Sequence, residues 1–174
     1  MIDASRRQAI AFQAARFDHA CFGCGDDNPI GLHLHFSPSS DGVRADFTPE
    51  TVHQGFDGII HGGIISTLLD EAMAWATTSA GVWSFTAEMS VRFKEPLSVG
   101  EPTTVTARVT ENRGRIIATA GELTRDRDGA IIATATGTFV RVSDAVAREW
   151  ESRYLENGWI DKNESGEPAR VNER

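Results

Sequence analysis

The long apolar segment at residues 62–80 constrains the fold of this chain more than any other stretch. It reads GGIISTLLDEAMAWATTSA, and only four of its side chains before Thr77 are polar. Apolar residues recur with the spacing of one helical face, which Ile64 and Trp75 widen, so the segment predicts an amphipathic helix that the rest of the chain surrounds. The predicted buried stripe consists of Ile65, Leu68, Leu69, Ala72, Met73 and Ala76.

Segments typical of β-strands lie on both sides of this helix. Two short alternating runs precede it, at 32–36 and 43–47, and residues 48–60 between them and the helix resemble a loop. Four longer runs rich in Val, Ile, Thr and Phe follow at about 84–94, 103–112, 115–126 and 130–142, separated by turn residues. Without alternating crossover helices, a parallel sheet is excluded. The order predicts an α+β hotdog fold, in which a curved antiparallel sheet wraps around one central helix.

The 174 residues fit one domain with additions at both ends. We expect an N-terminal helical arm at 1–18, the hotdog domain at 19–143, a C-terminal helix at 144–160 and a solvated, disordered tail at 161–174.

Charge and cysteine content restrict the partners and the compartment. The net charge of −8 disfavours a nucleic-acid partner, and no apolar run is long enough to span a membrane. Two cysteines cannot form a disulfide framework, and residues 1–20 lack the apolar core of a secretory signal. Arg6, Arg7 and Arg16 hint at a mitochondrial presequence, but Asp3 and Asp18 speak against one. We therefore expect a cytoplasmic protein.

The turn at His61-Gly62-Gly63 is the first candidate for chemistry. Backbone N–H groups at a helix start have no partner within the helix and lie at the positive end of its dipole. Two glycines leave these groups unshielded, so the turn suits an anion or a carbonyl that becomes one. The alternative is that the glycines serve only a tight turn.

Asp70 and Glu71 interrupt the apolar helix, where an unpaired carboxylate would be costly to bury. Either they reach the surface or one of them lines a cavity and acts there, and the helical pattern does not choose between the two. Gly62 and Asp70 are about 12 Å apart along the helix axis, at 1.5 Å per residue. One reacting carbonyl cannot contact both in a single subunit, so a site that uses both requires a homodimer with paired sites.

His61-Gly62-Gly63, with Asp70 nine residues after the histidine, resembles the signature of hotdog acyl-CoA thioesterases of the phenylacetate-pathway type. The leader Cys21-Phe-Gly-Cys24-Gly, followed by Asn-Pro-Ile-Gly-Leu at 28–32, resembles the leader of many bacterial members and of thioesterase-superfamily members four and five. The resemblance covers about residues 20–142. It implies that the Gly62 N–H polarises the thioester carbonyl, that Asp70 is nucleophile or general base, and that Thr86 helps to hold water.

One position departs from that pattern. Several members carry Asn or Gln six residues before the motif histidine, where this chain has Gly55. Gln54 and His53 stand beside it as possible replacements. We expect His61 to orient the loop by hydrogen bonding rather than to act as the base.

The resemblance implies hydrolysis of a medium-chain or aromatic acyl-CoA by a homodimer or homotetramer, without a metal or redox cofactor. Beside Gly63 and Gln54, the aromatic candidates for the acyl pocket are Phe56, Trp75, Trp83 and Phe85, each of which could instead be core. Arg113 and Arg115 are candidates for the CoA phosphates, or else belong to a solvated hairpin turn. The competing function is an acyl-CoA-binding sensor or scaffold without turnover; a dehydratase fits residues 48–63 poorly.

Cys21 and Cys24, with His33 and His35, are the residue types that bind zinc. Their spacing differs from the usual zinc arrangements, so we expect free cysteines packed against the domain. A redox CxxC motif would be expected to precede a helix, and Asp-Asp-Asn-Pro at 26–29 does not favour one.

Overall fold

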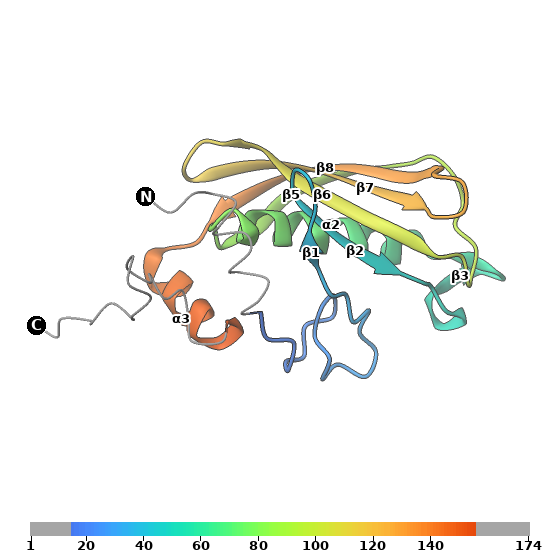
Figure 1. Ribbon diagram of the computed structural model, residues 1–174, viewed down its shortest axis with the longest axis horizontal. Coiled ribbons are helices and arrows are strands. Elements are labelled where there is room, and N and C mark those ends of the chain that lie inside the picture. The colour runs from blue at the N-terminus through green and yellow to red at the C-terminus, as the bar shows by residue number, and fades with distance from the viewer. Residues whose placement is uncertain (1–14, 156–174) are drawn as a thin grey trace, which may run out of the picture.

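The computed structural model describes residues 15–155, which form a curved antiparallel sheet around a central helix (Figure 1). The sheet has six strands in the order β1-β2-β6-β7-β8-β5. Its strands are β1 (Ser37–Pro38), β2 (Val43–Phe47), β5 (Ser84–Phe93), β6 (Thr103–Asn112), β7 (Ile116–Arg125) and β8 (Ile131–Arg141). This confirms the hotdog fold, and the four long strands agree with the sequence prediction to within one or two residues at each end.

Helix α2 (Gly62–Ser79) occupies the concave side of the sheet, where the apolar segment was predicted. All six residues of the predicted stripe are buried, and Ile64 and Trp75 pack against them while partly exposed. Gly121 and Gly137 lie where the helix approaches the sheet: a Cβ at Gly121 would lie 3.3 Å from the Met73 side chain, and one at Gly137 2.8 Å from the Phe139 ring. These two glycines therefore allow the close contact between α2 and the sheet.

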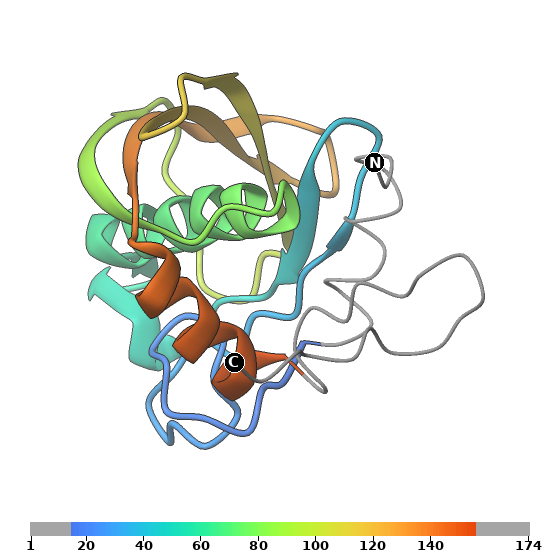
Figure 2. The same cartoon turned by 90° about the vertical axis from the view of Figure 1, so that its left-hand side faces the viewer.

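A third layer lies below α2, on the side away from the sheet (Figure 2). It consists of residues 15–36, which include the leader at 21–25, and helix α3 (Asp144–Tyr154), whose N-cap Ser143 accepts a hydrogen bond from the Val146 N–H. The predicted C-terminal helix is thus present up to Tyr154, and the tail predicted at 161–174 lies outside the described residues. Most of the predicted N-terminal arm also lies outside them. Its described end, 15–18, is not helical, and Ala15 forms an antiparallel bridge with Leu155.

Two local predictions before α2 were wrong. Residues 32–36 alternate between buried and exposed as a strand would, but the Leu32 and Leu34 N–H groups donate to the carbonyls of Phe22 and Gly23 in the leader. Residues 48–60 are not simply a loop. They contain a 3-10 turn (Thr51–His53) and a small hairpin of β3 (Gln54–Phe56) and β4 (Ile59–Ile60), which leads directly into α2.

No helix among residues 15–155 is long and apolar enough to cross a membrane.

Candidate active site

The start of α2 presents one backbone N–H to its surroundings. His61 is the N-cap, and its Nδ1 accepts a hydrogen bond of 2.8 Å from the Gly63 N–H. The His61 N–H donates to the His53 carbonyl, which ties the helix start to the preceding hairpin. Within residues 15–155 no acceptor takes the Gly62 N–H. Gly62 therefore offers a donor at the positive end of the helix dipole, whereas Gly63, grouped with it from the sequence, is already paired.

The glycines around this donor are explained by the space that the His61 ring occupies. A Cβ at Gly55 would lie 3.1 Å from Cδ2 of His61, and one at Gly63 would lie 2.9 Å from its Nδ1. Gly55 thus leaves room for the histidine ring, where several relatives were expected to carry a polar side chain. Both expected replacements accept hydrogen bonds from nearby backbone: the Gln54 Oε1 from the Gly58 N–H, and the His53 Nδ1 from the Glu50 N–H.

Asp70 lies two turns further along α2 and meets Thr86 on β5. The Thr86 Oγ1 donates a hydrogen bond of 2.8 Å to the Asp70 Oδ1, and Asp70 is partly exposed. A β-bulge follows Thr86 in β5, after which Glu88 takes the next pairing position with β8. The structure thus brings together two of the residues predicted from the sequence, as a carboxylate and a hydroxyl that together can hold a water molecule.

Glu71, the next residue, contacts the leader instead. Both its carboxylate oxygens lie 3.9 Å from the Cys21 Sγ, and a Cβ at Gly23 would collide with the carboxylate. Burial, followed by the charge of Cys21, raises the pKa of Glu71 to about 7. The two neighbouring carboxylates therefore have separate environments.

Trp75 and Trp83 line a pocket of about 360 Å³ between the second half of α2, the leader and α3. Sequence reasoning missed two aromatic residues of α3, Trp150 and Tyr154, which also line it. Their i, i+4 spacing on an amphipathic helix was the available signal. Two other predicted pocket residues are largely exposed: Phe85 (60%), which packs edge-on against Trp150, and Phe56 (82%), on the hairpin before α2.

Arg113 and Arg115 lie in the exposed turn between β6 and β7. The Arg113 Nε donates to Glu111 at 2.7 Å, while the Arg115 carbonyl accepts from the Arg141 N–H. Strand pairing places this turn near the start of β5, because Ile116 pairs with Val140 and Val140 with Phe85. The two arginines thus lie toward the end of the sheet where β5 begins, and their role toward CoA stays a prediction.

Among the described residues, one trio of potential metal ligands gathers: Cys21, Cys24 and Glu71, with donor atoms within 4.8 Å of one another. The histidines weighed with the cysteines lie elsewhere, since the His33 Nδ1 contacts the Gly25 carbonyl and the His35 Nε2 contacts Asp26. Two thiols and one carboxylate fall short of the four ligands typical of structural zinc sites.

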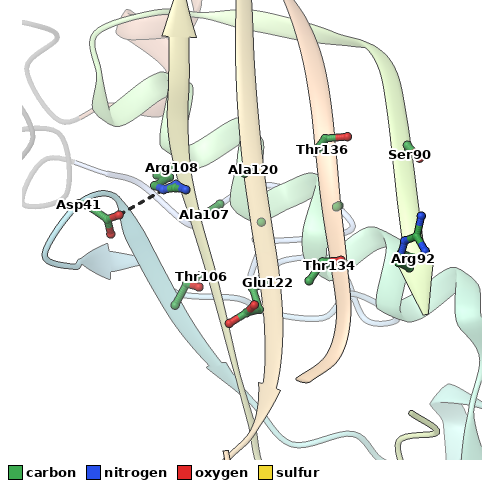
Figure 3. Close-up of a pocket in the computed structure, with 12 residues that line it drawn as sticks. Asp41, Ser90, Arg92, Thr106, Ala107, Arg108, Ala120, Glu122, Thr134 and Thr136 are labelled. Carbon is green, nitrogen blue, oxygen red and sulfur yellow. Dashed lines mark ion pairs between the residues drawn. The ribbon is translucent and has the colours of Figure 1, made fainter. Parts of the chain in front are cut away.

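A second, larger hollow of about 540 Å³ lies on the sheet, on the face away from α2 (Figure 3). Short side chains of β5 to β8 line it, together with Arg92 of β5, Glu122 of β7 and an ion pair between Arg108 and Asp41. Neither Gly62 nor Asp70 lines this hollow or the 360 Å³ pocket.

The sequence and the fold are similar to those of known thioesterases. Residues 57–132 match the Thioesterase superfamily. Acyl-coenzyme A thioesterase 13 from Homo sapiens is 30% identical over 98 residues, which span 55% of this chain and 70% of the human protein. Acyl-coenzyme A thioesterase THEM4 from Xenopus laevis is 28% identical, over 55% of this chain and 43% of the relative.

Solved structures of thioesterases share the fold of this chain. One thioesterase superfamily protein is 32% identical, with a TM-score of 0.63 over 67% of this chain and 60% of that structure. The PaaI protein of the Escherichia coli phenylacetic acid degradation operon has a TM-score of 0.60 at 21% identity, over 64% of this chain and 81% of its own. A hypothetical thioesterase from Streptococcus pneumoniae, solved with coenzyme A, has a TM-score of 0.59 at 18% identity, over 63% and 86% of the two chains.

Proposed function

This chain belongs to the thioesterase superfamily, and we propose that it hydrolyses acyl-CoA thioesters to the free acid and CoA. The observation that carries the proposal is the pairing of two features on one helix. The Gly62 N–H at the start of α2 is available to an oxygen atom, and Asp70 further along α2 is held by Thr86. The first suits a thioester carbonyl, and the second suits the water that attacks it.

In the proposed reaction, the thioester oxygen accepts the hydrogen bond of the Gly62 N–H. Negative charge grows on this oxygen as the carbonyl carbon is attacked, and a donor fixed at the helix start stabilises it. Asp70 either attacks the carbon itself or removes a proton from the attacking water, and Thr86 orients the carboxylate. Collapse of the intermediate breaks the C–S bond, and the CoA thiolate leaves and takes up a proton. If Asp70 was the attacking group, water then hydrolyses the anhydride between the acyl group and Asp70 and releases the acid.

The proposed enzyme is at least a homodimer, because Gly62 and Asp70 of one subunit are too far apart to contact one carbonyl. Strand β5 supports this arrangement: it pairs only with β8, so its other edge is open among the described strands. Phe93 at the end of β5 is 52% exposed and lies beside Gly62. Antiparallel pairing of two β5 edges would bring the start of one α2 toward Asp70 of the other. Two such dimers would form the tetramer.

The substrate class we propose is a medium-chain or aromatic acyl-CoA. The pocket with Trp75 and Trp83 offers several aromatic side chains and a suitable volume, beside the polar Arg16, His19 and Glu71. Arg113 and Arg115 remain our candidates for the CoA phosphates, and the proposed chemistry uses no metal or redox cofactor. We also propose a cytoplasmic location, for which the two free cysteines are the support.

The test is steady release of CoA thiol from a panel of acyl-CoA esters, followed with a thiol reagent. Turnover of medium-chain or aryl esters is the expected result, and the preferred ester defines the acyl group. Saturable binding of acyl-CoA without thiol release would instead support a sensor or scaffold.

A further inference from the structure

The two cysteines of the leader differ in their exposure. Both line the 360 Å³ pocket, but Cys21 is partly exposed, whereas Cys24 is buried, with 6% of its surface exposed. The turn that joins them is closed by a hydrogen bond of 3.0 Å from the Gly25 N–H to the Cys21 carbonyl. In a pair of thiols that differ in this way, the more exposed one can react with a molecule from solution, and the buried one can react with its neighbour.

The surroundings of the pair place the proton on Cys24. The pKa of Cys21 is lowered to about 5 against the effect of burial. The causes, in decreasing order, are the Cys24 thiol, the backbone N–H groups of Cys24 and Gly23, and the nearby His19. The contact with Cys21, burial and the charge of Glu71 raise the pKa of Cys24 above its usual range. Cys21 is therefore the thiolate of the pair at neutral pH, and Cys24 remains a thiol.

Glu71 places a carboxylate beside the two cysteines. Its carboxylate approaches both sulfurs, because the absent side chain of Gly23 leaves room for it. The titratable and polar groups around this carboxylate come from three places. Its own helix contributes Asp70 and Trp75, and the leader contributes Cys21 and Cys24. The same pocket is also lined by Arg16, His19 and Tyr154. With a pKa of about 7, this carboxylate can both accept and return a proton near neutrality.

From this geometry we propose that Cys21 and Cys24 form a redox-active dithiol that reacts with small disulfides, with Glu71 as the proton acceptor for Cys24. The cysteines were expected to serve packing alone, because no helix follows them. In the structure, the backbone N–H groups of Gly23 and Cys24 take the place of that helix, and the Glu71 carboxylate lies beside the pair. The proposed exchange shares the 360 Å³ pocket with the acyl group proposed above, but it does not require thioester hydrolysis.

The reaction balances as two exchanges. The Cys21 thiolate attacks one sulfur of a disulfide R–S–S–R, its S–S bond breaks, and the first thiolate R–S⁻ leaves and takes up a proton. Cys24 then passes its proton to Glu71, attacks the Cys21 sulfur and forms the internal disulfide. The second thiolate leaves and takes up that proton. The pair, which starts as one thiolate and one thiol, loses two electrons and one proton; the solvent supplies the other proton, and R–S–S–R becomes two R–SH.

The test uses the reduced full-length chain with oxidised glutathione, acid quenching and intact-mass analysis. Wild-type protein should lose two hydrogens and carry no glutathione. Cys24→Ser should accumulate one glutathione on Cys21, whereas Cys21→Ser should react far more slowly. Glu71→Gln should form the adduct on Cys21 and resolve it at least about 10-fold more slowly. Glu149→Gln, an exposed glutamate of α3, is the matched control and should behave as wild type.

Several results would overturn the proposal: a stable glutathione adduct on the wild-type protein, equal reactivity of the two single-cysteine variants, or unchanged resolution in Glu71→Gln. Stoichiometric bound zinc that blocks both thiols until chelation would overturn it as well. Alkylation of native wild-type protein gives a readout that needs no variant. Cys21 should be labelled well before Cys24, and equal rates in the folded protein would contradict the assigned roles.

Discussion

At the scale of single residues, the adjacent carboxylates of α2 provide a matched pair of substitutions. Asp70→Asn keeps the shape of the side chain but removes the charge that attacks or activates water, so we expect the rate of thioester hydrolysis to fall about 10²–10⁴-fold. Glu71→Gln changes a side chain that lines the proposed acyl pocket but does not act on the reacting carbonyl, so it should lower hydrolysis much less. Thiol release from the best ester, with circular dichroism as a control for folding, measures both. Equal losses would reject Asp70 as the reacting carboxylate.

Glu71 also predicts how stability depends on pH. Its pKa is raised to about 7 in the folded protein, so between about pH 4.5 and 7 the folded state binds more protons at this position than the unfolded state does. This group therefore contributes a free energy of unfolding that falls as pH rises through that interval. The lowered pKa of Cys21 acts in the opposite sense between about pH 5 and 9, and Cys24, Asp70 and Trp75 also face the carboxylate.

The comparison of wild type with Glu71→Gln isolates the glutamate. The free energy of unfolding of wild type, minus that of the variant, should fall between about pH 4.5 and 7 and then level off. Urea unfolding at a series of pH values measures this difference. A difference that rises over the same interval would show that the folded carboxyl is more acidic than usual.

The sequence allowed Asp70 and Thr86 to be predicted as site residues, but it did not predict the environment of Glu71. The spacing from His61 selects Asp70 only through the resemblance to thioesterases, because the helical pattern alone leaves both carboxylates equivalent. The proximity of Cys21 to Glu71 joins positions 50 residues apart in the chain. No local pattern encodes such a contact, so the environment of Glu71 required the fold.

At the scale of elements, the long helix and strands were predicted correctly, whereas the shortest ones were not. Helix α2 and the four long strands repeat their hydrophobic period over many residues, which identified them. The hairpin of β3 and β4 has strands of three and two residues, too short for any period to show. Residues 32–36 have the alternation of a strand, but they contact the backbone of the leader rather than the sheet.

The contact between α2 and the sheet depends on Gly137 of β8. A Cβ there would lie 2.8 Å from the Phe139 ring and from the Thr119 Oγ1, and 3.1 Å from the Met73 Sδ. Gly137→Ala should therefore lower the free energy of unfolding by about 1–3 kcal/mol through overpacking. Thr136→Val, at the exposed neighbouring position, should change it by no more than about 0.5 kcal/mol. Urea unfolding of both variants measures these changes. If Gly137→Ala were as stable as wild type, the contact between α2 and the sheet would not depend on a glycine at this position.

At the scale of the whole molecule, the proposed active site is shared between two subunits, and mixing two inactive variants tests this directly. Gly62→Pro removes the backbone N–H at the first position of α2, where proline is well tolerated. His61 already has the extended backbone that a following proline requires, with φ −64° and ψ 133°. Asp70→Asn removes the carboxylate. Each variant alone should be a folded dimer whose hydrolysis is reduced at least about 10²-fold.

Dimers formed by mixing the two variants, after mild dissociation and reassembly, should regain activity. In a heterodimer, one site combines the Gly62 N–H of the Asp70→Asn subunit with the Asp70 of the Gly62→Pro subunit, while the other site lacks both. Equal mixing makes about half the dimers mixed, each with one intact site, so about a quarter of wild-type activity should return. If Gly62 and Asp70 of the same subunit acted together, every site would lack one group and no activity would return. Light scattering on the same samples gives the oligomeric state, and a stable, active monomer would contradict the shared site independently.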